Sequence, residues 1–248
     1  MGYRVRLTWW CDGRLVMKQH HLVIFPSRTG STLVYNWISQ NLCKPAFNFY
    51  PSLYSSEIND KFFEYFLYNV KKLNDMDWCL KYQLSCGSNI SNGNVNSEEA
   101  GRFFRETNVS NLHFCFRVDI LDTILSDLIA YTDNSYVVNN NQVLTRGKRH
   151  INKESVHFKC QSYQMGTVLY KNYVDQYSEL YDSKFYCYEN LSTIFDTEDD
   201  SLGMKKQLGF EEKKNLIKNY DEVLGILKLY DFYYGRINQR NGVLEYDK

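Results

Sequence analysis

The sequence predicts an α/β fold in which a central parallel β-sheet is flanked by helices. Short apolar runs of strand length, such as residues 22–25, alternate along the chain with longer segments whose apolar residues recur at helical spacing. Because strands that are separated by helices pair in parallel, this alternation favours a sheet covered on both faces. At 248 residues, with no internal repeat and no linker, the chain is expected to form a single domain, residues 1–248.

The first half of the chain is expected to begin with an N-terminal extension or hairpin at residues 1–20, with Asp12-Gly13 as its turn. The apolar run 22–25 then predicts a buried strand, and a loop of small residues follows it. The next elements are expected in the order helix 33–42, irregular aromatic segment 44–55, helix 57–73, strand 77–84 and polar loop 85–96.

The second half continues the same alternation. A helix is expected to begin at Ser97, a capping residue, with Glu98 and Glu99 in its first turn. The elements after it are expected in the order strand 112–116, helix 119–131, helix 154–180, strand 184–188, charged loop 197–209 and helix 211–229.

Composition excludes several classes of function. Lys and Arg together number 29, as do Asp and Glu, so no net charge favours binding to nucleic acid or to an anionic membrane. No apolar run is long enough to span a membrane. Seven cysteines without a C-x-x-C pair favour buried thiols in a reducing, cytoplasmic compartment. The histidines and carboxylates show no familiar metal-ligand spacing, so no metal is expected.

The segment 26–32, Pro-Ser-Arg-Thr-Gly-Ser-Thr, has the features of an anion-binding loop. It lies between a predicted strand and a predicted helix, where backbone N–H groups and the helix dipole favour a phosphate or sulfate. Gly30 is expected to let a ligand approach the backbone. Ser31 and Thr32 add hydroxyl donors, and Arg28 adds a fork of charged donors. The segment lacks G-x-x-x-x-G-K-[ST], the pattern of a nucleoside-triphosphate loop.

This segment resembles the 5′-phosphosulfate loop of sulfotransferases that use 3′-phosphoadenosine-5′-phosphosulfate, among them bacterial and viral members. The resemblance implies a P-loop-kinase-like sulfotransferase fold, with cofactor contacts from Arg28, Thr29, Gly30, Ser31 and Thr32. It also implies that Arg28 is catalytic.

Two later segments are similar to the same family. Residues 114–130, with Arg117 at a strand end and Ser126 on the next helix, resemble the family's 3′-phosphate element, although the separation of nine positions exceeds the eight common there. Lys206 and Gln207 lie in a stretch similar to a C-terminal segment that folds over the nucleotide. Residues 185–191 resemble another late segment, in which Glu189 is expected to orient or cap its neighbours.

Sulfuryl transfer requires a base for the acceptor's proton. In cytosolic sulfotransferases a strand similar to 78–83 carries Lys-x-His, with the His as the base. Lys81 matches and is predicted to be catalytic, but Gln83 stands where the His would be. The resemblance to tyrosylprotein and carbohydrate sulfotransferases makes Glu57 the first candidate base, with His150 and His157 as alternatives.

The sequence does not identify the acceptor, for which a carbohydrate, a phenol or tyrosine, and a small alcohol are equally suitable. Two other functions remain open. One is a kinase or related phosphotransferase, which a magnesium requirement would reveal. The other is a non-catalytic nucleotide-binding protein, because an amide at position 83 cannot take a proton.

Overall fold

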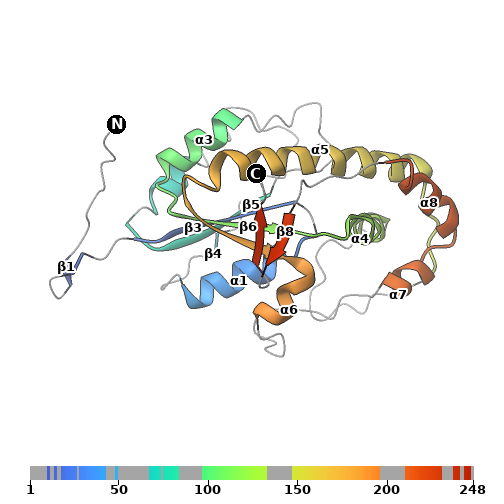
Figure 1. Cartoon of the computed structure of the whole chain (residues 1–248), viewed down its shortest axis with the longest axis horizontal. Helices are drawn as coiled ribbons and strands as arrows, with labels where there is room; N and C mark the ends of the chain where they lie inside the picture. Colours follow the sequence, from blue (N-terminus) through green and yellow to red (C-terminus); the bar gives the residue numbers. More distant parts are fainter. Residues whose placement is uncertain are drawn as a thin grey trace.

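The computed structural model describes twelve stretches of the chain: residues 10–11, 14–15, 18–26, 28–42, 48–49, 67–73, 75–83, 97–132, 147–195, 210–230, 237–240 and 243–246. A parallel sheet forms its centre (Figure 1). The strand order is β4-β5-β3-β6-β7, and every neighbouring pair is parallel. The strands are β4 (Asn48–Phe49), β5 (Trp78–Gln83), β3 (His20–Phe25), β6 (Asn111–Phe116) and β7 (Asp182–Cys187).

The strand order creates a switch point beside β3. From β3 the chain continues to β4 and β5 on one side of it, whereas β6 and then β7 lie on its other side. The loops that leave the carboxyl ends of β3 and β6 therefore diverge from adjacent strands. Ligands of open α/β sheets bind at this kind of position, at the carboxyl edge of the sheet.

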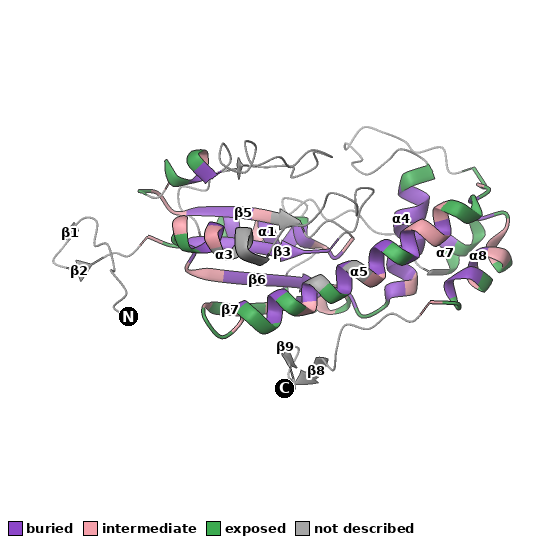
Figure 2. Ribbon diagram, turned by 90° about the horizontal axis from the view of Figure 1, so that it is seen from above, coloured by how far each residue is buried: buried purple, intermediate pink, exposed green. Residues whose placement is uncertain are grey.

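Helices lie on both faces of the sheet, which confirms the predicted α/β class (Figure 1). α1 (Ser31–Asn41) and the short α6 (Leu191–Ile194) lie on one face, and α3 (Ser97–Glu106) and α5 (Lys153–Tyr177) on the other. The central strands β3 and β6 are largely buried, whereas β7 is buried only at its last two residues (Figure 2). Along β3, Val23 and Phe25 pack with α1, whereas Leu22 and Ile24 belong to the larger cluster beneath α5.

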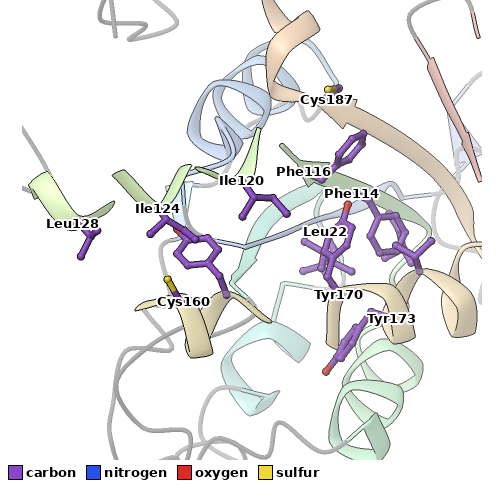
Figure 3. Packing of buried hydrophobic residues seen from close by; sticks show 14 of the residues in the cluster. Leu22, Phe114, Phe116, Ile120, Ile124, Leu128, Cys160, Tyr170, Tyr173 and Cys187 are labelled. Carbon is purple, nitrogen blue, oxygen red and sulfur yellow. The ribbon is translucent and has the colours of Figure 1, made fainter. Parts of the chain in front are cut away.

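The larger cluster joins the sheet to α5 and to α4 (Ile120–Thr132) (Figure 3). The ring of Phe114 on β6 meets Tyr170 of α5 edge to face, with centroids 6.0 Å apart. Nearer the start of α5, Cys160 belongs to the same cluster as Ile124 and Leu128 of α4. These contacts hold the beginning of α4 at the end of β6.

The helix predicted at 211–229 is interrupted, so that prediction was wrong in this respect. The structure has two helices, α7 (Phe210–Asn215) and α8 (Tyr220–Leu227). Arg149 separates them, because its N–H donates to the carbonyl of Leu216 and its carbonyl accepts from Lys218. The side chain of Asn219 also makes two hydrogen bonds with the backbone of Ile151. Contacts between segments so distant in the sequence leave no periodic signal.

Other boundaries agree with the sequence to within a few residues. β1 (Trp10–Cys11) and β2 (Arg14–Leu15) pair antiparallel around positions 12 and 13, as expected for the hairpin. Of the helix predicted at 57–73, the structure describes residues 67–73, which are helical over 67–71. β4 lies in a segment that was predicted to be irregular. A 3₁₀ turn, η1 (Tyr188–Asn190), follows β7, and β8 (Ile237–Arg240) pairs with β9 (Val243–Tyr246).

Two expectations from composition concern the described residues. Cys79, Cys115, Cys160 and Cys187 are buried free thiols, as expected. Within the described ranges, no helix has the length and apolar character needed to cross a membrane.

Candidate anion-binding site

The loop after β3 has an unusual backbone conformation. Arg28 has a φ of 62° and Gly30 a φ of 71°, both in the left-handed region. A non-glycine residue in this region costs roughly 1–2 kcal/mol, and such residues are concentrated at functional sites. Gly30 precedes the first turn of α1, so the free N–H groups of that turn lie next to Arg28 in the chain.

The structure gives Gly30 a packing role that was not predicted from the sequence. A Cβ atom built on it would lie 2.5 Å from Cδ1 of Leu191 and 2.9 Å from Cδ2 of Tyr188. The space on the Cβ side of this glycine is therefore filled by η1 and α6. Glycine is required here by its positive φ and by this close packing.

Two loop hydroxyl groups are less accessible than the sequence suggested. Thr29 is buried, and its hydroxyl donates to the carbonyl of Pro26 at 2.9 Å. Ser31 is buried as well, whereas Thr32 is exposed. We conclude that the Thr29 side chain stabilises the loop, so that only its backbone is left for a ligand.

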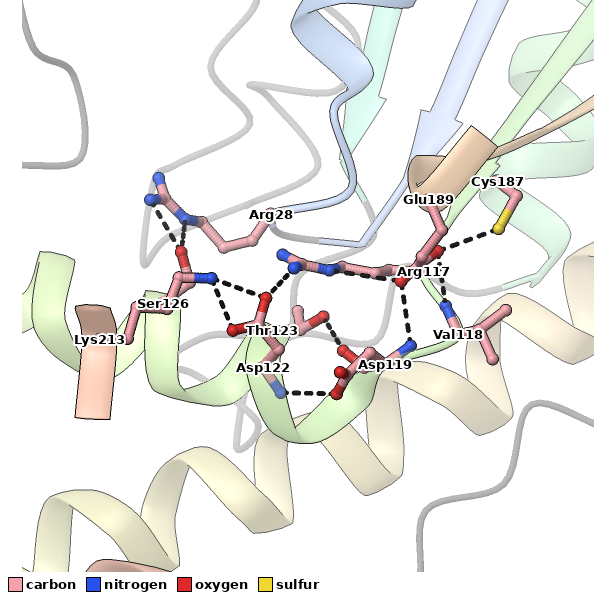
Figure 4. Close-up of polar contacts among 10 residues, drawn as sticks. All are labelled: Arg28, Arg117, Val118, Asp119, Asp122, Thr123, Ser126, Cys187, Glu189 and Lys213. Atoms are coloured by element: carbon pink, nitrogen blue, oxygen red, sulfur yellow. Dashed lines mark hydrogen bonds and ion pairs between the residues drawn. The ribbon is translucent and has the colours of Figure 1, made fainter. Parts of the chain in front are cut away.

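Arg117 lies at the end of β6 and is buried, with 5% of its surface exposed (Figure 4). Its Nη2 donates to Oδ2 of Asp122, and its Nε lies 3.6 Å from Oε1 of Glu189. The guanidinium carbon lies 4.1 Å from the centroid of the Tyr188 ring. Neither Nε nor Nη1 has a hydrogen-bond acceptor in the described part of the chain. A buried guanidinium with unmatched donors is suited to an anion.

Asp122 joins Arg117 to a residue of α7. The Nζ of Lys213 lies 2.6 Å from each carboxylate oxygen of Asp122, and both side chains are buried (Figure 4). Burial lowers the pKa of Lys213, the charges of Arg117 and Arg28 lower it further, and the bond to Asp122 offsets part of this shift. A single carboxylate is thus shared by two cations.

Arg28 and Ser126, predicted from separate motifs, contact each other. Nε and Nη2 of Arg28 donate to Oγ of Ser126 at 3.3 and 3.2 Å (Figure 4). The partner is a neutral hydroxyl, so the charge of Arg28 is not neutralised by this contact. The separation of nine positions between Arg117 and Ser126 therefore still places both residues beside the loop.

Glu189 caps the start of the α4 segment, which confirms the structural role expected for it. Its carboxylate accepts hydrogen bonds from the backbone N–H groups of Val118 and Asp119 at 3.2 and 3.1 Å. The thiol of Cys187 also donates to it. Burial opposes ionisation of Glu189, but these hydrogen bonds outweigh it and hold its pKa below the usual value.

Lys81 approaches the same loop from β5. Its Nζ donates to Oγ1 of Thr32 at 2.9 Å and lies 4.7 Å from the centroid of the Phe25 ring. Burial lowers the pKa of Lys81 to about 8. The predicted catalytic lysine thus contacts the first turn of α1.

Several predicted residues have no described side chain. Glu57, Lys206 and Gln207 lie outside the described residues, and of Gln83 only the backbone in β5 is described. The two alternative bases are described. His150 is exposed, and Nδ1 of His157 lies 2.7 Å from the hydroxyl of Tyr230.

Sequence reasoning missed Asp122 and Lys213. Asp122 could have been found, because it lies five positions after Arg117, in the first turn of the next helix. Lys213 is separated from Asp122 by 91 positions and sits in an ordinary charged helix segment, so nothing in the sequence connects the two.

The site as a whole has an excess of positive charge. The site contains four cations, Arg28, Arg117, Lys213 and Lys81. Its ion-paired carboxylates, Asp122 and Glu189, contact only Arg117 and Lys213 among these cations, and Lys81 has no carboxylate partner in the described ranges. The arrangement can bind an anion with more than one charge at the carboxyl edge of the sheet. Among the described side chains, no three that ligate metals cluster together. Comparison of the chain with models of protein families, with curated proteins and with solved structures gave no match.

Proposed function

We propose that this protein is a sulfotransferase that moves a sulfuryl group from 3′-phosphoadenosine-5′-phosphosulfate to a hydroxyl or amine acceptor. One observation carries the proposal: the arginine of the predicted 5′-phosphosulfate loop and the serine of the predicted 3′-phosphate element are hydrogen-bonded to each other. A ligand with two separate anionic groups, attached to one ribose, suits two such elements held side by side.

The described residues fit this nucleotide. The unmatched Nε and Nη1 donors of Arg117 suit phosphate oxygens. Ser126 lies in α4, one turn after Asp122, the residue that pairs with Arg117. Arg28 and the N-terminal turn of α1 suit the 5′-phosphosulfate, with Thr32 as the exposed hydroxyl. Lys213 adds a cation from a different part of the chain than Lys206 and Gln207, whose predicted contacts remain predictions.

The bound donor supplies the sulfuryl group and a phosphate as the leaving group. In-line transfer leaves negative charge on the oxygen that bridges sulfur and phosphorus. Arg28 and the first turn of α1 are the groups that stabilise this charge, because their donors are already held in place by the loop. Arg117 and Ser126 act at a distance from the reaction by orienting the nucleotide.

Experiment can distinguish sulfuryl transfer from two other functions, that of a kinase and that of a protein that only binds the nucleotide. A kinase requires a magnesium ion at the phosphates, whereas sulfuryl transfer to an alcohol does not. A protein that only binds the nucleotide would show affinity without turnover. The acceptor remains unassigned among carbohydrates, phenols and small alcohols.

The test uses donor labelled with ³⁵S and a panel of acceptors of these three classes, with EDTA present to remove divalent metal ions. We expect label to appear on one class of acceptor. Label on none of them, together with phosphate transfer from ATP that depends on magnesium, would contradict the proposal and favour a kinase.

A further inference from the structure

The side chain of Lys81 extends from β5 to the start of α1. Its strand, β5, pairs with β3 in a register that sets Lys81 beside Val23, on the face covered by α1. From there its amine reaches the last residue of β3, Phe25, and the second residue of α1, Thr32. The amine is therefore next to the place where the phosphosulfate loop becomes a helix.

The ring face of Phe25 favours the charged form of Lys81, whereas no described carboxylate does so. Its contacts are a neutral hydroxyl and an aromatic ring, and none of the described carboxylates forms an ion pair with it. The titratable groups that face it are the thiols of Cys79 on its own strand and Cys115 on β6, both buried. The helix α1 contributes no charged side chain.

We propose that Lys81, as a neutral amine, is the base that removes the acceptor's proton during transfer. The inference rests on the sulfuryl transfer proposed above and replaces the predicted role of Glu57. A hydroxyl held 2.9 Å from the amine shows that an oxygen fits within hydrogen-bond distance of Nζ. An acceptor oxygen that attacks a sulfonate in the loop would come close to the same amine.

The step is balanced as follows. The acceptor oxygen forms a bond to sulfur as the bond from sulfur to the bridging oxygen breaks, and that electron pair stays on the 5′-phosphate. The proton of the acceptor moves to Nζ and produces an ammonium group. After product release the ammonium loses this proton to solvent, and Lys81 returns to its neutral form.

This role fixes the direction of the pH dependence. Burial lowers the pKa of Lys81 to about 8, whereas Cys115 and Cys79 raise it to a smaller extent. The neutral fraction therefore increases as the pH rises towards 8 and beyond. A lysine that acted as a cation, by stabilising the leaving oxygen, would give the opposite trend, with the rate falling over the same range.

The first test is the single-turnover rate of the wild-type protein, with saturating labelled donor, from pH 6 to pH 9.5. We expect the rate to rise across this range, with a midpoint at or above the pKa of about 8 that Lys81 has in the ligand-free protein, because the bound anionic donor favours the ammonium form. A rate that falls through this midpoint would overturn the inference, because Lys81 would then act in its charged form.

The second test compares Lys81→Met, Lys81→Arg and Glu57→Gln. Both Lys81 variants should lose about 10²-fold or more in rate, because neither can accept a proton at neutral pH. Glu57→Gln should keep its rate, and so should Lys184→Met, a matched control at an exposed strand lysine. Normal turnover by Lys81→Arg, or a large loss in Glu57→Gln alone, would refute the role of Lys81.

Binding of 3′,5′-adenosine bisphosphate separates failure of this inference from failure of the proposed function. If Lys81→Met binds the bisphosphate as the wild type does, the variant is folded and its rate reports on the base. If the wild-type protein itself does not bind the bisphosphate, the sulfotransferase proposal fails, and the inference about Lys81 fails with it.

Discussion

The histidines near the amino end of the central sheet and the arginines at its carboxyl end differ in how their nitrogens are paired. Nε1 of Trp78, although it lies at the amino end, is also buried without a hydrogen-bond partner in the described part of the chain. At the amino end, His20 of β3 lies against the carbonyls of Asn108 and Met76, at 2.9 and 3.1 Å, and its ring stacks on Trp78. Each ring nitrogen lies within hydrogen-bond distance of a carbonyl, and a neutral ring donates to one of the two. At the carboxyl end, the guanidinium of Arg117 keeps two buried nitrogens without an acceptor in the described part of the chain.

The same contrast holds for a second set of histidines, which are buried on the adjacent strands β3 and β6. His21 and His113 share a hydrogen bond of 2.9 Å, and each has a second partner, Gln19 for His21 and the hydroxyl of Tyr186 for His113. This network is complete within the protein. Among the described residues, Arg28, at the other end of β3, has only the hydroxyl of Ser126 as a hydrogen-bond partner.

The difference indicates which end binds a ligand. Buried polar groups in folded proteins are almost always hydrogen-bonded, so a complete network needs no further partner. Arg28 lies on a strained loop at the switch point of a parallel sheet, and Arg117, at the end of the adjacent strand, has unmatched donors, so this pair is suited to an anion. The paired histidines His21 and His113 thus stabilise the fold, whereas the arginines of the carboxyl end can take a further partner.

The largest expected effect comes from Arg28→Gly. Removal of the guanidinium should lower the transfer rate by about 10³-fold, because a preorganised charged donor is lost. Since Arg28 has a φ of 62°, glycine relieves the backbone, and the variant should be more stable than the wild type by roughly 1 kcal/mol. Urea denaturation and a transfer assay measure the two effects, and a variant that is more stable but fully active would contradict the assignment.

The next effect concerns Arg117. Arg117→Met should weaken binding of 3′,5′-adenosine bisphosphate by about 10²-fold, because charge-assisted hydrogen bonds contribute roughly 1.5–3 kcal/mol each. Arg117→Lys keeps the charge but loses the planar fork, so it should recover only part of the affinity. Equal affinity in all three proteins, measured by calorimetry, would show that the unmatched nitrogens do not face the nucleotide.

A smaller effect is expected at the amino end, on stability alone. Burial lowers the pKa of His21 from 6.5 to about 4 and that of His113 to about 3. Below pH 6.5 the unfolded chain therefore takes up protons that the folded chain does not, so stability should decrease as the pH falls towards 4. At roughly 1.4 kcal/mol for each pKa unit, the loss from His21 reaches about 3 kcal/mol.

Urea denaturation between pH 7.5 and pH 4.5 measures this loss. His113→Gln should make the pH dependence shallower, whereas the exposed His150→Gln should leave it unchanged. If His113→Gln instead altered nucleotide affinity in the folded protein, the division between a structural and a functional end of the sheet would be incorrect.

The class of fold was predictable because it depends on local patterns. Strand 112–116 and helix 154–180 each have a continuous apolar signal, and the structure has β6 and α5 at these positions. The interruption of the last helix was not predictable, because it depends on the pairing of Arg149 with residues 216–218. Periodicity carries no information about such distant contacts.

The candidate site was predictable to a similar degree. Arg28, Arg117 and Ser126 belong to local motifs, and the structure brings them together. Lys213 and its ion pair with Asp122 join residues from distant segments, and the packing of Gly30 against Tyr188 and Leu191 also depends on distant contacts. Local chemistry thus predicted the cations that the structure brings together, whereas the residues that position them required the tertiary structure.

The most direct test of the account is a calorimetric titration of the protein with 3′,5′-adenosine bisphosphate, with ATP as the control. We expect micromolar or tighter binding of the bisphosphate, lost in Arg28→Gly and weakened in Arg117→Met, and no comparable binding of ATP. Selective binding of ATP, or bisphosphate affinity that neither variant changes, would contradict the assignment of the carboxyl edge as a site for this nucleotide.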